Sequence, residues 1–105
     1  MPRDRLSSYL LNSKENDCFD YYDGGSMRKI TDSYDKAGGR QNYWFSVFVR
    51  VLARIKKKHG SPDPNNKDGK IVHLSYGRKE CMAVFFIPEP NGRYTIYDFQ
   101  IAPLS

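Results

Sequence analysis

His59 and His73 are the two histidines of this sequence, and histidine is the side chain whose ordinary pKa lies nearest to neutral pH. His59 ends a run of lysines, where we expect a solvated side chain. His73 lies in a stretch of alternating apolar and polar residues, which places it on one face of a strand. With Tyr97 or Glu80 as a nearby proton donor, His73 has the chemistry of a general base in a metal-independent ribonuclease. The alternative is a His73 with a purely structural, hydrogen-bonded role.

Other catalytic motifs are absent from the sequence. It contains no P-loop, no G-x-G-x-x-G pattern and no H-E-x-x-H pattern. Ser26 lacks the second glycine of a nucleophile elbow. Cys18 and Cys81 are far apart and form no C-x-x-C pair, so no structural zinc site is indicated. We therefore predict no cofactor, no metal and two free thiols, with a disulfide as the alternative in an oxidising compartment.

Positive charge is concentrated in the middle of the chain. The whole sequence carries 17 Lys and Arg against 12 Asp and Glu, for a net charge of +5. Between residues 37 and 79 there are ten basic residues and two acidic ones. Such a segment suits an anionic partner, and aromatic residues on the strands suit base stacking. The residues expected to contact nucleic acid are Arg50, Arg54, Lys57, Lys58, Arg78, Lys79, Arg93, Phe85 and Phe99.

This pattern predicts a small basic domain that contacts nucleic acid, with RNA or single strands favoured over a specific duplex sequence. A ribonuclease-like or toxin-like activity is one form of the hypothesis. The alternative is a non-catalytic protein-binding module, such as an inhibitor or immunity-type protein with an acidic partner. Arginine and aromatic residues are frequent at protein interfaces as well, so the same side chains support both interpretations.

A helix is predicted over residues 40–59. The apolar residues at helical spacing are Trp44, Phe48, Val51 and Ile55. Arginine and lysine recur on the opposite side, and the lysines at the end of this segment complement the negative end of the helix dipole. Gly60 suits the position that follows a helix C-cap.

Beyond a polar loop at 61–69, the apolar period changes from helical to alternating. Residues 70–76, 80–87 and 93–101 are typical of three strands joined by short turns, which implies an antiparallel meander. A turn at 77–79 would pair Leu74 with Met82 and place their face of the sheet against the helix.

The other face of this sheet carries the candidate chemistry. A turn at 77–79 places His73 and Phe85 on it together. If residues 88–92 form a five-residue loop, Tyr97 and Phe99 join the same face and extend an aromatic platform. A one-residue error in that loop would reverse the faces of the third strand, because side chains alternate with a period of two.

Together these patterns predict a single domain over residues 1–105, as the length suggests. The expected fold class is α+β: one long amphipathic helix packed on an antiparallel meander of three or more strands, with an irregular N-terminal layer. That layer spans residues 1–36, the helix 40–59 and the meander 70–101. Aromatic residues of the N-terminal layer would cover the His73 face if that face is not open.

Membrane association is not expected. No apolar segment approaches the roughly 18 residues that a spanning helix needs, and the start of the chain lacks the apolar region of a secretory signal. We predict a cytoplasmic location or, alternatively, a mature fragment of a larger exported protein.

Overall fold

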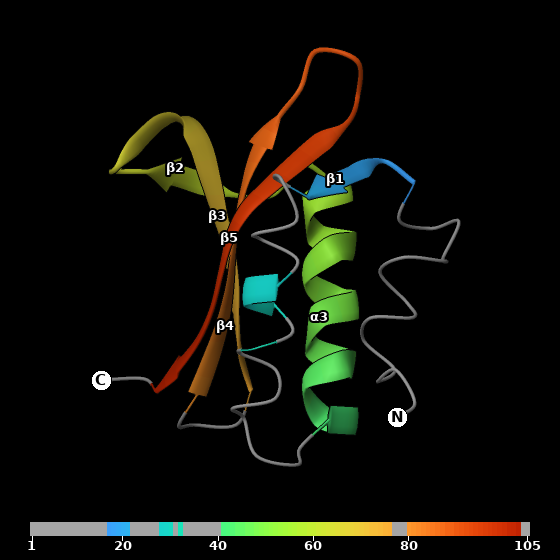
Figure 1. Ribbon diagram of the computed structural model, residues 1–105, viewed down its shortest axis with the longest axis vertical. Helices are drawn as coiled ribbons and strands as arrows, with labels where there is room; N and C mark the ends of the chain where they lie inside the picture. Colours follow the sequence, from blue (N-terminus) through green and yellow to red (C-terminus); the bar gives the residue numbers. More distant parts are fainter. Residues whose placement is uncertain (1–16, 22–27, 31, 33–40, 77–79, 104–105) are drawn as a thin grey trace.

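The computed structural model describes residues 17–21, 28–30, 32, 41–76 and 80–103. Five strands form one sheet in the order β1-β5-β4-β3-β2, and helix α3 lies against one face of it (Figure 1). Residues 28–30 and 32 are also helical. The elements are β1 (Phe19–Tyr21), α3 (Gln41–Lys56), β2 (Ser61–Asp63), β3 (Asn66–Tyr76), β4 (Glu80–Pro88) and β5 (Tyr94–Pro103). No helix in these described ranges is long and apolar enough to cross a membrane.

The structure overturns the predicted fold class. The molecule is built on a five-stranded mixed sheet rather than on one long helix over an antiparallel meander, and α3 has 16 residues. The mixed character comes from β1, which pairs with β5 in parallel. A three-residue strand is too short to show a period. Its pairing with a strand some 75 positions later is a tertiary contact, which local pattern does not reveal.

The segment expected to be a loop forms β2 and the first part of β3. Two prolines in this segment argue against a central strand, because proline has no N–H to donate. Pro62 is compatible with a strand because β2 lies at the edge of the sheet, where one side of the backbone needs no partner, and Pro64 lies in the turn that follows β2. Asp63 ends β2 with a side chain that is buried to 7% exposure and that accepts a hydrogen bond from the Asn65 backbone N–H at 2.8 Å.

Helix α3 ends at Lys56, earlier than the predicted end at residue 59. The Lys58 N–H donates to the Ile55 carbonyl at 2.9 Å, and the His59 N–H donates to the Arg54 carbonyl at 3.0 Å. These two bonds are those of a Schellman cap. Lys58 has the left-handed φ of 65° that a glycine usually supplies in this cap.

The core lies between α3 and the facing side of the sheet. Its buried apolar members are Phe19, Ile30, Val47, Phe48, Val51, Leu52, Ile55, Val72, Met82, Val84, Phe86, Ile96 and Phe99. The predicted pairing of Leu74 with Met82 is confirmed. Phe19 and Ile30 belong to the N-terminal third, and both are part of this core. The described part of that third therefore packs on the α3 side and does not cover the His73 face.

A β-bulge decides which way Phe99 points. The pairing of β4 with β5 shifts by one residue next to Phe85, which leaves Tyr97 as an extra residue in β5. One extra residue reverses the alternation of side chains beyond it. Phe99 consequently lies in the core, with its ring 5.8 Å from that of Phe48. The prediction that Phe99 shares a face with His73 is wrong for this reason.

Candidate functional site

The three predicted catalytic residues do not come together. His73 is exposed on the face of the sheet opposite α3, where it pairs with Ala83 of β4. Glu80 and Met82 are two residues apart on β4, so their side chains point to the same face of the sheet. Met82 is fully buried on the α3 side. Because alternate residues point to opposite faces, Glu80 and His73 lie on different sides of the sheet.

Tyr97 is on the same face as His73, but its hydroxyl is engaged elsewhere. It donates a hydrogen bond to the buried carboxylate of Asp63. Burial, together with this carboxylate, raises the pKa of Tyr97 above its usual range. The hydroxyl lies over Gly69, where an added Cβ would clash with it. Gly69 and His73 are four residues apart on β3, or about 13 Å along an extended strand.

The predicted aromatic platform is reduced to two rings. Phe85 and Tyr97 are partly exposed, with ring centroids 6.1 Å apart and an angle of 60° between their planes. Phe99 is absent from this face because it is buried in the core. Helix α3 covers the other face of the sheet (Figure 1), so its cations are separated from the platform by the sheet itself.

Of the predicted cations that follow β3, the structure describes Arg93. Arg93 makes a two-pronged ion pair with Asp20, at 2.9 and 2.7 Å. The guanidinium holds the pKa of the Asp20 carboxyl below its usual range. Arg78 and Lys79 lie outside the described residues.

Two cations of α3, together with the lysine that directly follows the helix, line an open groove beside β3. Arg50, Arg54 and Lys57 occupy one side of the helix, and Leu74 of β3 contributes an apolar wall to a hollow of about 460 Å³. Along the helix axis the successive cations are about 6 and 4.5 Å apart. Within the described part of the chain, no carboxylate lies within ion-pairing distance of them. Among the described residues, the groove is therefore a positive surface without a compensating carboxylate.

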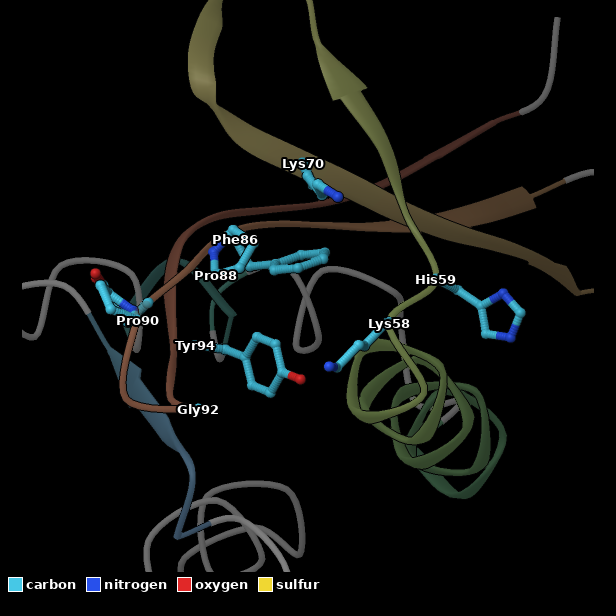
Figure 2. A pocket seen from close by; sticks show the side chains of 9 residues that line it. Lys58, His59, Lys70, Phe86, Pro88, Pro90, Gly92 and Tyr94 are labelled. Carbon is cyan, nitrogen blue, oxygen red and sulfur yellow. The ribbon is translucent and has the colours of Figure 1, made fainter.

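A second hollow, of about 310 Å³, lies where the chain leaves α3 and faces the β4–β5 turn. It is lined by Lys58, His59, Lys70, Phe86, Pro88, Glu89, Pro90, Gly92 and Tyr94. Figure 2 shows Lys58 reaching into this pocket on the side of the Tyr94 hydroxyl, whereas His59 points away from it. The rings of Phe86 and Tyr94 meet edge to face, with centroids 5.9 Å apart.

Sequence reasoning named Lys58 but missed the other members of this pocket. Lys70 could have been identified from the sequence, because it shares a face of β3 with the buried Val72. A charged residue on the face that packs against the helix is unusual and points to a special role. Tyr94 could not have been identified from the sequence, because its position in the fold depends on where the β4–β5 loop ends. Only the folded chain brings these residues to the end of α3.

The two cysteines are not bonded to each other in the structure. Cys18 and Cys81 are both partly exposed free thiols, and burial raises the pKa of Cys81. The described residues contain no cluster of three or more histidine, cysteine or acidic side chains with the geometry of a metal site.

Comparison with known proteins adds no further information about the site. No protein-family model, no curated protein and no solved structure matches this chain.

Proposed function

We propose that the chain binds RNA or single-stranded nucleic acid through the groove formed by Arg50, Arg54 and Lys57. The observation that carries this proposal is that the three cations line one hollow with no described carboxylate to neutralise them. Cations in this arrangement contact phosphates, which supply affinity without reading sequence. Leu74 gives the groove an apolar wall against which a sugar or base can lie.

Single strands are favoured over duplexes by an aromatic side chain close to the basic end of the helix. Tyr94 is partly exposed beside Lys58, where the chain leaves α3. Only unpaired bases can leave a stack and lie against such a ring. The proposal is for binding and not for cleavage, because His73, Tyr97 and Glu80 do not converge.

The test is to neutralise the groove and measure binding. The triple variant Arg50→Gln, Arg54→Gln, Lys57→Gln should bind a fluorescently labelled single-stranded RNA at low salt at least about tenfold more weakly than the parent, since each charged hydrogen bond contributes about 1.5–3 kcal/mol. All three side chains are exposed, so the fold should be retained, as circular dichroism would confirm.

A matched control separates position from net charge. The variant Lys29→Gln, Arg93→Gln, Lys67→Gln removes the same number of positive charges. Lys29 and Arg93 are already ion-paired with Asp98 and Asp20, and surface pairs of this kind contribute little to stability. Equal loss of binding in the two triple variants would mean that net charge matters and the groove does not.

A second candidate, the protein-binding module, is supported by the edge of β3. Pairing of β3 with β2 ends at Ile71, and no other described strand pairs with that side of residues 72–76. An extended peptide can add to such an edge, and acidic side chains on it would face the groove cations. No affinity of the parent for the RNA, combined with groove-dependent binding of an acidic peptide, would favour this function.

A further inference from the structure

The pocket at the end of α3 combines an aromatic wall with two lysine side chains in one small space. Its volume of about 310 Å³ is at the lower end of the range for small-molecule sites, which suits one ligand unit rather than a polymer. It is distinct from the basic groove, whose lining residues are entirely different. Any ligand of this pocket is therefore an addition to the proposed function.

One wall of the pocket is aromatic and held in place. Tyr94 is partly exposed, and its ring packs against Phe86 at 5.9 Å and against Phe19 at 5.5 Å. Phe86 is buried at 2% exposure, so it serves as a fixed support behind Tyr94. A ring fixed before binding loses little freedom when a flat ligand lies against it. The wall therefore suits a planar group.

The cations at this pocket come from two separate elements. Lys58 follows α3 and reaches into the hollow, and Lys70 projects from β3 (Figure 2). Both are exposed, and no described carboxylate pairs with either of them. Glu89 also lines the pocket, but its carboxylate accepts a hydrogen bond at 2.7 Å from the Thr95 hydroxyl, and Thr95 points to the face of β5 opposite to Tyr94. Two ammonium groups with no described carboxylate partner, at a hollow of this size, fit a phosphate, for which lysine is a common ligand.

The backbone at Lys58 sets the direction of one of these cations. Lys58 has a φ of 65°, a conformation that L-residues other than asparagine and aspartate rarely adopt. The capping bonds of Lys58 and His59 hold the chain in that conformation. The two consecutive side chains consequently point in different directions, Lys58 into the pocket and His59 away from it (Figure 2).

We infer that this pocket binds a nucleoside monophosphate unit, with its base against Tyr94 and its phosphate at Lys58 and Lys70. The unit is either a free nucleotide or the phosphorylated end of a strand, because both present the same ring and the same phosphate monoester. A monoester carries a charge of about −1.5 to −2 at neutral pH, which matches two lysines better than a single diester charge does.

The first experiment measures binding of small ligands to the full chain by titration calorimetry. We expect saturable binding of adenosine 5′-monophosphate, and weaker binding of adenosine and of inorganic phosphate, each of which retains one of the two contacts. No saturable binding of the monophosphate, or equal binding of inorganic phosphate, would overturn the inference. Tighter binding of phenyl phosphate than of the nucleotide would assign the pocket to a phosphorylated aromatic side chain instead.

The second experiment tests the two lysines. Lys58→Gly and Lys70→Gln should each weaken binding of the monophosphate at least about tenfold, since each removes a charged hydrogen-bond donor. Glycine is the residue that the conformation at position 58 favours, so loss of binding in Lys58→Gly cannot be attributed to unfolding. Lys67→Gln changes an exposed lysine outside the pocket and should leave binding unchanged. Unchanged binding in the two pocket variants would place the ligand elsewhere.

Strands with and without a terminal phosphate distinguish the two sources of the ligand. A gain in affinity on adding a 5′- or 3′-phosphate to one oligonucleotide, lost in Lys58→Gly, would identify the strand end as the ligand. Nucleotide binding without that gain would identify a free nucleotide. Salt-dependent strand binding with neither nucleotide binding nor that gain would overturn the pocket inference and leave the proposed function intact.

Discussion

Lys58 has a backbone conformation in which glycine would make the folded chain more stable. Its φ of 65° places Cβ close to the following carbonyl, at a cost of about 1–2 kcal/mol. Lys58→Gly removes this cost but gains chain entropy in the unfolded state, which offsets part of the benefit. We expect the free energy of unfolding to rise by about 0.5–1 kcal/mol, measured as a higher urea midpoint with an unchanged slope.

A glycine in regular helix provides the contrast. Ala53 is exposed in α3, and Ala53→Gly should lower the free energy of unfolding by about 1 kcal/mol. A decrease in both variants would show that position 58 has ordinary helical geometry. The expected result is a free energy of unfolding that rises in Lys58→Gly and falls in Ala53→Gly, while Lys58→Gly binds the nucleotide more weakly. That result would show that the chain keeps a less stable residue at position 58 because the lysine contributes to binding.

Tyr97 links the stability of the sheet to alkaline pH. Burial and the hydrogen bond to Asp63 raise its pKa in the folded chain, whereas an unfolded tyrosine titrates near about pH 10. The folded state therefore binds the phenolic proton more tightly. This contribution to stability is complete below about pH 10 and is lost as the pH rises towards the folded pKa.

The corresponding measurement is a series of urea melts between about pH 9 and pH 11.5. The parent should lose stability more steeply above about pH 10 than Tyr97→Phe, which has no phenolic proton to lose. Other tyrosines and the lysines titrate in both proteins, so their effect cancels in the comparison. Parallel pH profiles would mean that the Tyr97 hydroxyl is not held by Asp63.

At the scale of the elements, the bulge in β5 turns Phe99 to the face of the sheet opposite to that of Phe85. Phe99 is 1% exposed and packs on Phe48, whereas Phe85 is partly exposed beside Tyr97. Phe99→Ala should lower the free energy of unfolding by about 3–5 kcal/mol, as for other buried phenylalanines. Phe85→Ala should cost clearly less, because its ring is not enclosed.

Chemical denaturation of the two variants tests this assignment directly. Equal costs, or a larger cost at Phe85, would mean that β5 runs without the bulge and that alternation continues unbroken to Phe99. Phe48→Ala offers a further check from the helix side, because Phe48 is fully buried and its ring contacts that of Phe99. Phe48→Ala should lower the free energy of unfolding by the same amount, about 3–5 kcal/mol.

At the scale of the whole molecule, the charge distribution predicts a salt dependence. Each cation that contacts a phosphate of a single strand contributes about −0.7 to the slope of log K against log salt concentration, through counterion release. Neutralising Arg50, Arg54 and Lys57 should therefore flatten that slope by about 2. The control variant at Lys29, Lys67 and Arg93 should keep the parental slope. The measurement is fluorescence anisotropy of a labelled single strand over a series of salt concentrations.

The sequence by itself determined the features that depend on local pattern. Residues with helical spacing, such as Phe48 and Ile55, identified α3 and its buried face. Strict alternation and a short turn were enough to set the register of β3 on β4 and the face of the sheet on which His73 lies. The side of the groove cations followed as well, because helix periodicity places Arg50, Arg54 and Lys57 on one side of the helix predicted over residues 40–59.

Only the tertiary structure decided the fold class and the shape of the two hollows. The parallel pairing of β1 with β5 and the edge position of β2 join segments whose own residues show no strand period. A single extra residue at Tyr97 moved Phe99 from the predicted platform into the core, since one bulge reverses every later side chain. The pocket of Lys58, Lys70 and Tyr94 draws on three elements at once. Long-range pairing and bulges are set by packing of the whole chain, which leaves no local trace in the order of residues.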